Sequence, residues 1–228
     1  MNKNYTEILK SLKNDETPKN ADDRILIIDG LNTFIRSFVV VPTVNDNGIH
    51  VGGITGFLMS IGYAIRNIKP TRVIICFDGK GGSQKRRKIF PNYKSSRRVR
   101  HRMTRINAFN SVDDERIAMA QQLQRLSEYL ETLPVTVLSP ENIEADDAMA
   151  YIANEIYTKE SQKVTIVSTD RDFLQLINNR IQVWSPVKKK MYTPETLAEE
   201  YGIHHKNYLM YRVFSGDKSD NIPGINGV

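Results

Sequence analysis

The sequence predicts an α/β fold with a mainly parallel central sheet flanked by helices, and two patterns support this prediction. Short continuous apolar runs such as ILII and VIIC are typical of strands covered on both faces of a sheet. These runs alternate with longer segments of helical periodicity, as in chains built from strand–helix–strand units. At 228 residues, the chain is long enough for one substantial domain.

The expected elements follow one another in a regular order. Strands are expected at residues 25–29, 72–77, 135–138, 163–168 and 181–184, and helices at 30–40, 54–68, 111–133, 139–157, 170–178, 194–202 and 205–216. Residues 185–192 resemble the return of a hairpin. Pro70 ends the second helix, Ser111 followed by acids begins the third, and Pro194 begins another.

Positive charge is concentrated in one segment. The net charge is +6, from 32 Lys and Arg against 26 Asp and Glu. Eleven of these bases lie between Lys80 and Arg105, where there is no acid, so the rest of the chain has 21 bases against 26 acids. This segment indicates either a polyanionic partner or a solvated basic loop that binds nothing in particular.

Other features limit the class of protein. No stretch approaches the roughly 20 apolar residues that a membrane-spanning helix needs. The polar residues 1–23, which include Pro18, form an expected extension without the apolar core of a signal peptide. The single cysteine, Cys76, excludes an internal disulfide. We therefore expect a cytoplasmic protein that does not contact a membrane.

Acidic residues recur just beyond predicted strands or at the start of predicted helices. Each could simply cap a helix. However, the carboxyl ends of parallel strands meet at one edge of a sheet, and a dense carboxylate cluster needs cations to stay ionised. Mg²⁺ and Mn²⁺ favour such oxygen ligands. The acids are Asp29, Asp78, Glu144, Asp146, Asp147, Asp170, Asp172, Asp217 and Asp220.

Five segments carry a resemblance to a known family. They are IIDGLNTFIR (27–36), CFDG (76–79), EADD (144–147), STDRDFLQL (168–176) and GDKSDNIPGINGV (216–228). In these segments the chain resembles the flap endonuclease/5′→3′ exonuclease family, whose catalytic core is a PIN-like domain. The likeness is strongest to phage and bacterial members, including the phage enzymes named ribonuclease H.

The resemblance implies a two-metal site of Mg²⁺ or Mn²⁺. Its first group would be Asp29, Asp78, Glu144, Asp146 and Asp147, and its second Asp170, Asp172, Asp217 and Asp220. Two such ions stabilise the attacking water and the leaving oxygen of a phosphodiester displacement. Arg36 and Lys94 would act catalytically by holding the scissile phosphate.

The resemblance also divides the chain. A catalytic core over 24–215 would include a basic helical arch or loop at 80–110, through or under which a single-stranded 5′ end passes. In this arch Tyr93 would stack on a base, and Lys85, Arg86, Arg97 and Arg98 would contact the nucleic acid. Residues 216–228 would begin a helix–turn–helix element, which holds K⁺ when complete and which we expect to be truncated here.

The implied function is a structure-specific 5′ nuclease. It would cleave DNA at 5′ ends or flaps, and RNA–DNA hybrids, during removal of RNA primers in replication. We expect a monomer, in contact with replication proteins, in a bacterium or a phage-infected host. A PIN-type single-strand ribonuclease is one alternative, although it would lack GDKSDNIPG. The other is a nucleic-acid binder without catalysis, although no acid of the pattern is missing.

Overall fold

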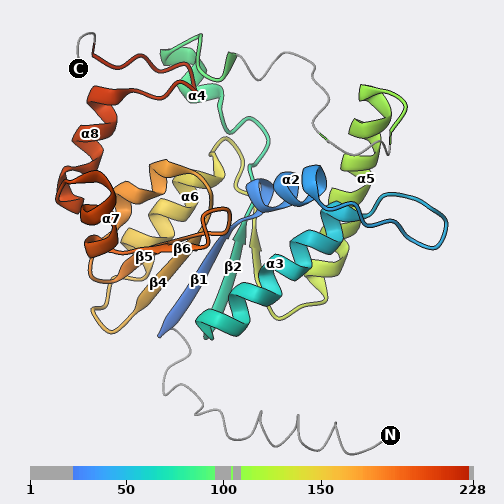
Figure 1. Cartoon of the computed structure of the whole chain (residues 1–228), viewed down its shortest axis with the longest axis horizontal. Coiled ribbons are helices and arrows are strands. Elements are labelled where there is room, and N and C mark those ends of the chain that lie inside the picture. The colour runs from blue at the N-terminus through green and yellow to red at the C-terminus, as the bar shows by residue number, and fades with distance from the viewer. Residues whose placement is uncertain (1–22, 96–103, 105–108, 226–228) are drawn as a thin grey trace, which may run out of the picture.

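A six-stranded sheet forms the centre of the molecule (Figure 1). The computed structural model describes residues 23–95, 104 and 109–225. The strand order is β3-β2-β1-β4-β5-β6, and only the β5–β6 pairing is antiparallel. The strands are β1 (Arg24–Asp29), β2 (Arg72–Cys76), β3 (Thr136–Leu138), β4 (Lys163–Val167), β5 (Ile181–Ser185) and β6 (Lys190–Tyr192). This confirms the predicted α/β fold with a mainly parallel sheet.

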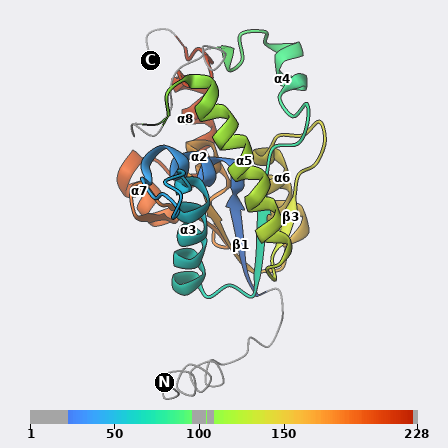
Figure 2. The same ribbon diagram turned by 90° about the vertical axis from the view of Figure 1, so that its right-hand side faces the viewer.

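Helices cover both faces of the sheet, and Figure 2 shows α3 and α6 on opposite sides of β1. One face carries α2 (Gly30–Val40), α3 (Gly52–Ile68) and α5 (Val112–Glu131). The other carries α6 (Ala145–Tyr151), the 3-10 helix η3 (Arg171–Leu176), α7 (Pro194–Tyr201) and α8 (Tyr208–Ser215). A π-helical turn, η2 (Ile152–Ile156), continues α6, and a 3-10 turn, η4 (His205–Asn207), precedes α8.

Strand β1 explains why an uninterrupted apolar run suits this position. Ile25 and Ile27 point into the core beneath α6 and η3, whereas Leu26 and Ile28 point into the core beneath α2 and α3. Successive residues of a strand face opposite sides, so a strand buried on both sides needs apolar residues throughout. All four residues are at most 1% exposed.

The register brings the carboxyl ends of three strands together. Asp29 pairs with Cys76 of β2, and Ile28 pairs with Val167 of β4. The residues that follow β2 and β4 therefore emerge beside the end of β1. This edge of the sheet is where open parallel sheets place their ligand sites.

Two helices differ from the sequence prediction. The helix expected from residue 139 begins only at Ala145, after a turn in which Asn142 has a φ of 60°, outside the helical range. The basic segment, expected as a helical arch or a loop, contains a short helix, α4 (Gln84–Ile89), none of whose residues is buried. The helix expected at 170–178 is a 3-10 helix over Arg171–Leu176. The extension predicted over residues 1–23 lies, apart from Asp23, outside the described residues.

Within the part of the chain that the structure describes, no helix is both long and apolar enough to cross a membrane.

Candidate active site

Four carboxylates converge beyond the strand ends. Asp29 ends β1, Asp78 follows β2, Asp170 follows β4, and Asp146 lies in the first turn of α6. Each is close enough to influence the ionisation of another. Asp78 and Asp170 repel Asp29, while Asp29, Asp170 and Asp78 all repel Asp146. The convergence predicted from strand ends is therefore present for these four.

Ser168 joins two of these acids across neighbouring strands. Its hydroxyl donates to Asp29 Oδ2 at 3.0 Å and accepts from the backbone N–H of Asp170 at 3.0 Å. Asp29 Oδ1 also accepts from the Asn32 N–H at 3.0 Å, and Asp170 Oδ1 from the Asp172 N–H at 2.8 Å. Asp29 and Asp170 therefore each cap a helix and also belong to the cluster. A capping role does not exclude a role in metal binding.

Asp78 attaches the end of β2 to the start of α6. Its Oδ1 accepts from the backbone N–H of Ala145 at 2.7 Å. The chain passes closely here, because a Cβ placed on Gly79 would lie 1.8 Å from the carbonyl oxygen of Pro140. Only glycine permits this approach, which holds the helix that carries Asp146 against the end of β2.

The environment penalises ionisation of Asp29, Asp146 and Asp170. Burial, with repulsion from Asp78 and Asp170, raises the pKa of Asp29 to about 6. Burial, followed by repulsion from Asp29 and Asp170, raises the pKa of Asp146 to about 7. Burial also raises the pKa of Asp170. None of the four forms an ion pair with another described residue. We call Asp29, Asp78, Asp146 and Asp170 the unpaired carboxylates.

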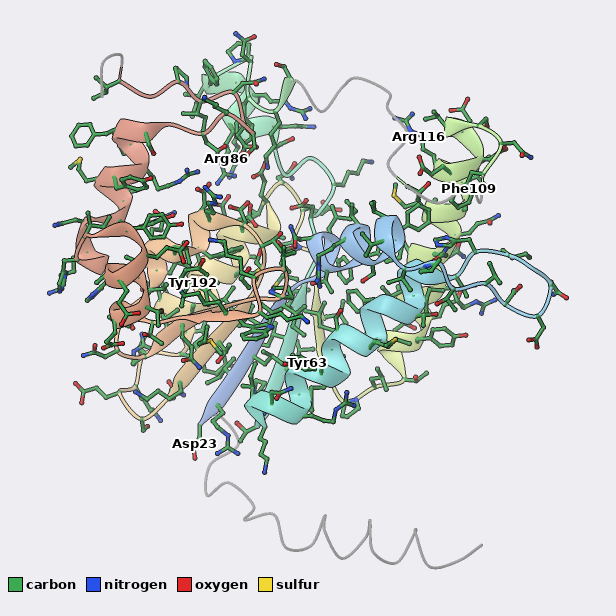
Figure 3. All side chains as sticks on the ribbon, in the orientation of Figure 1. Asp23, Tyr63, Arg86, Phe109, Arg116 and Tyr192 are labelled. Atoms are coloured by element: carbon green, nitrogen blue, oxygen red, sulfur yellow. The ribbon has the colours of Figure 1, made fainter. Side chains whose placement is uncertain are left out.

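Two further acids of the EADD motif are paired with cations from the basic segment. Glu144 Oε2 lies 3.1 Å from Lys94 Nζ and 3.0 Å from Arg86 Nη1, and it accepts from the Tyr93 hydroxyl at 3.0 Å. Arg86 also donates to both oxygens of Asp147, at 2.8 and 2.6 Å. Figure 3 shows Arg86 between α4 and the core. These bonds attach the base of the predicted arch to α6.

Asp172 and Asp217 share a third cation, Arg212 of α8. Its Nε and Nη2 donate to Asp172 Oδ1 at 3.1 and 2.8 Å, and Nη2 also donates to Asp217 Oδ2. We call Glu144, Asp147, Asp172 and Asp217 the paired carboxylates. Asp220 is buried, and its carbonyl oxygen accepts from the Lys94 N–H at 3.2 Å.

Sequence reasoning missed Arg212 and Ser168. Arg212 lies 40 residues from Asp172, on an amphipathic helix where an arginine attracts no notice. Ser168 was within reach, because it opens the STDRD motif directly after β4. The available signal was a hydroxyl at the end of a strand, two residues before an acid of the cluster.

The predicted phosphate-binding and nucleic-acid-binding residues differ in their surroundings. Arg36 of α2 is half-buried, and its Nε and Nη2 have no hydrogen-bond partner among the described residues. Lys85 is exposed on α4. Tyr93 is only 6% exposed, and Lys94 Nζ lies 4.8 Å from its ring centre, so the ring does not offer the open stacking face that we expected. Arg97 and Arg98 lie outside the described residues.

A cleft of about 560 Å³ is lined both by the base of the arch and by acids of the site. Arg86, Phe90 and Tyr93 line it from the basic segment, and Asp146 and Asp172 from the core. The loop that contributes Asp220 and Ile222 to the cleft is bonded to the basic segment, because the Asn221 side chain donates to Asn92 O at 3.2 Å and Ser95 Oγ at 2.7 Å. The 217–222 loop and the segment after α4 thus lie side by side (Figure 1).

The donor set suits a hard divalent cation. The unpaired carboxylates supply only oxygen, and they concentrate negative charge where no described cation forms an ion pair with them, although the charge of Lys94 partly offsets the repulsion at Asp146. Across residues 23–95, 104 and 109–225, no three His, Cys, Asp or Glu side chains are already gathered closely enough to bind one ion. The fit therefore rests on the chemistry and charge of the donors.

Comparison with known proteins identifies the family of the chain. The profile of the 5′-3′ exonuclease, N-terminal resolvase-like domain, matches residues 24–202. A 5′-3′ exonuclease of Aquifex aeolicus is 30% identical over 205 residues, which cover 90% of this chain and 65% of that protein. DNA polymerase I of Mycobacterium tuberculosis is 31% identical over 215 residues, 91% of this chain but 22% of the polymerase.

A solved structure has the same fold. The T5 5′-exonuclease, in a structure with bound zinc, superposes with a TM-score of 0.72 at 20% identity, covering 90% of this chain and 71% of that one. This likeness confirms the PIN-like fold that the motifs implied. The match of the family profile over residues 24–202 shows that the chain belongs to the 5′-3′ exonuclease family.

Proposed function

We propose that the chain is the catalytic core of a metal-dependent 5′ nuclease, which hydrolyses phosphodiester bonds at the 5′ ends or flaps of DNA and RNA–DNA hybrids. The convergence of the unpaired carboxylates supports this most directly. Four acids from four separate segments meet at the carboxyl edge of the sheet without an ion pair to any described residue. Buried like charges are costly, so a fold keeps them where an external cation repays the cost.

The acids would bind Mg²⁺ or Mn²⁺ in two groups. The unpaired carboxylates would bind the first ion and share Asp170 with a second group of Asp172, Asp217 and Asp220, whose charges already act on Asp170. When bound, such ions activate water and neutralise charge on the phosphate. The side chains would need to move closer together as the ions bind, since no three are gathered in the described structure.

Arg36 and Lys94 would hold the scissile phosphate. The unpartnered Nε and Nη2 of Arg36 form one edge of the guanidinium, which suits two oxygens of a phosphate. Lys94 already acts electrostatically on Asp146, so its ammonium group lies beside the unpaired carboxylates. Exchange of its bond with Glu144 for a bond with phosphate would place its charge at the reacting group.

The substrate class follows from the charge of the segment above the cleft. Residues 80–110 carry the excess positive charge of the chain, and Lys85 on α4 is open to a polyanion. We propose that a single-stranded 5′ end passes this segment on its way to the acids. Removal of RNA primers during replication, by a cytoplasmic monomer that contacts replication proteins, would use this activity. Residues 216–228 would start a helix–turn–helix element that holds K⁺ and grips the duplex.

Cleavage of a labelled substrate tests the proposal. A 5′-flap duplex and a matched RNA–DNA hybrid are incubated with the chain in Mg²⁺, in Mn²⁺ and in EDTA. We expect short 5′ products only with metal, and none from an Asp146→Asn variant. Products in EDTA, or an Asp146→Asn variant that cleaves at the native rate, would show that the unpaired carboxylates are not the reactive centre.

A further inference from the structure

Arg212 is largely buried, whereas the residues next to it on α8 are exposed. Its side chain is 16% exposed, and its three nitrogens all donate. Nε and Nη2 contact Asp172, Nη2 also contacts Asp217, and Nη1 donates to the carbonyl oxygen of Gly216 at 3.2 Å. One guanidinium therefore joins η3, the end of α8 and the loop that follows it.

The loop holds Asp217 in the orientation that meets Arg212. Asp217 Oδ1 accepts from the Ser219 N–H at 2.7 Å and from the Ser219 hydroxyl at 2.6 Å. Its backbone pairs with Ile222, and Gly216 has a φ of 66°, a conformation that favours glycine. Both oxygens of Asp217 are thus engaged, whereas Asp172 Oδ2 has no hydrogen bond to a described residue.

The charge at this place is consequently reduced by half. Asp172 and Asp217 contribute two negative charges, and Arg212 contributes one positive charge in direct contact with both. A divalent cation that approaches the pair must compete with the guanidinium for Asp172 Oδ1 and Asp217 Oδ2. It also meets the repulsion of a fixed positive charge at short range. No described cation contacts the unpaired carboxylates directly, and Lys94 acts on Asp146 only from its bond with Glu144.

We propose that Arg212 is a built-in counter-ion of the second metal group, which holds Asp172 and Asp217 in place and keeps this group weak for divalent cations until nucleic acid is bound. The inference rests on the proposed function, because it assumes that these acids bind metal. Phosphate would add negative charge and favour the ion over the guanidinium. The second ion would then bind tightly only in the complex with substrate.

Direct measurement of Mn²⁺ binding, without nucleic acid, tests this. Free Mn²⁺ is counted by electron paramagnetic resonance during titration of the native chain and of Arg212→Gln and Arg212→Lys variants. We expect one stronger and one weaker site in the native chain. In Arg212→Gln the weaker site should gain about tenfold or more in affinity, since a unit charge in contact is removed. Arg212→Lys should gain less, because it keeps the charge but loses the fork.

The outcomes separate the two proposals. A native stronger site with an unchanged or weakened second site in both variants would overturn the role of Arg212 and leave the nuclease proposal intact. No Mn²⁺ binding by the native chain would overturn both. Circular dichroism would reveal whether Arg212→Gln fails to fold. In that case Arg212→Lys decides, because its preserved charge keeps the fold. Its second site should still gain affinity for Mn²⁺, since the guanidinium fork that competes for the carboxylate oxygens is lost. Arg125→Gln, on the exposed side of α5, is the matched control and should change neither site.

Discussion

The unpaired and the paired carboxylates lie in the same site but differ in what surrounds them. Asp29, Asp78 and Asp170 are held by neutral donors, namely backbone N–H groups and the Ser168 hydroxyl. Glu144, Asp147, Asp172 and Asp217 are held by Arg86, Lys94 and Arg212. Neutral donors fix an acid in place without cancelling its charge, whereas a guanidinium does both.

This difference assigns two roles within one acidic cluster. The unpaired carboxylates keep an uncancelled charge that a metal ion can neutralise, and the raised pKa values of Asp29 and Asp146 reflect the cost of keeping it. The paired carboxylates connect the cluster to the arch and to α8. Their negative charge is neutralised by Arg86, Lys94 or Arg212 until a metal ion replaces that cation, or a phosphate draws it away. The following experiments test this division.

Asp146→Asn should have the largest effect. Cleavage should fall by at least about 100-fold, because a ligand of the metal group is lost. In EDTA the variant should be at least as stable as the native chain, since a half-buried, repelled charge is removed. Cleavage rates and thermal unfolding in EDTA measure both. Asp147→Asn is the matched control from the paired carboxylates. If it lowers the cleavage rate more than Asp146→Asn does, the unpaired carboxylates are not the main metal ligands.

Arg36→Met should lower cleavage by about 10- to 100-fold, the worth of a charge-assisted hydrogen bond to phosphate. Met keeps the packing of the methylene groups and removes the unpartnered nitrogens, so the free energy of unfolding should stay the same or rise. Single-turnover cleavage and urea unfolding test this, with Arg125→Met as the control. A clear loss of stability would mean that Arg36 is a structural residue.

Ser168→Ala removes the neutral donor that joins Asp29 and Asp170. The free energy of unfolding should fall by about 1 to 3 kcal/mol, because a buried carboxylate and a buried N–H lose their shared partner. Affinity for Mn²⁺ should fall as well. Ser127→Ala, on the exposed side of α5, is the control. Lost stability with unchanged Mn²⁺ affinity would limit Ser168 to a structural role.

Glu200 forms ion pairs outside the site, so its substitution should have the smallest effect. The hydrogen bond from Lys188, with a second from Lys190, lowers the pKa of Glu200 to about 2. A lowered pKa in the folded state stabilises the fold above the unfolded value of about 4.5, and this contribution disappears as the pH falls towards 2.

Glu200→Gln should therefore cost less than about 1 kcal/mol at pH 7, because the group is near the surface. The cost should shrink on acidification through this range. Urea unfolding at pH 7, 4 and 2.5 measures it. A cost that stays constant with pH would show that packing, and not the ion pairs with Lys188 and Lys190, explains the effect. Cleavage should not change at any pH where the chain is folded.

Much of the fold followed from local pattern. The β1 run predicted a strand buried on both faces, Ser111 and Pro194 marked true helix starts, and the register then brought Asp29, Asp78 and Asp170 to one edge. The start of α6 was not predictable, because a turn with Asn142 in a left-handed conformation displaces it. The basic segment was expected as a helical arch or a loop, and periodicity could not place α4 within it, because this helix has no buried face.

The sequence by itself determined which acids lie at the carboxyl edge, because apolar periodicity and strand ends are local properties. Only the tertiary structure decided which of them keep their charge. Arg86 lies 61 residues from Asp147, Lys94 lies 50 from Glu144, and Arg212 lies 40 from Asp172; only Asp217 is near its partner in the chain, five residues after Arg212. An ion pair depends on separation in space, and no local pattern records it. The division of the site into unpaired and paired carboxylates is thus a product of folding.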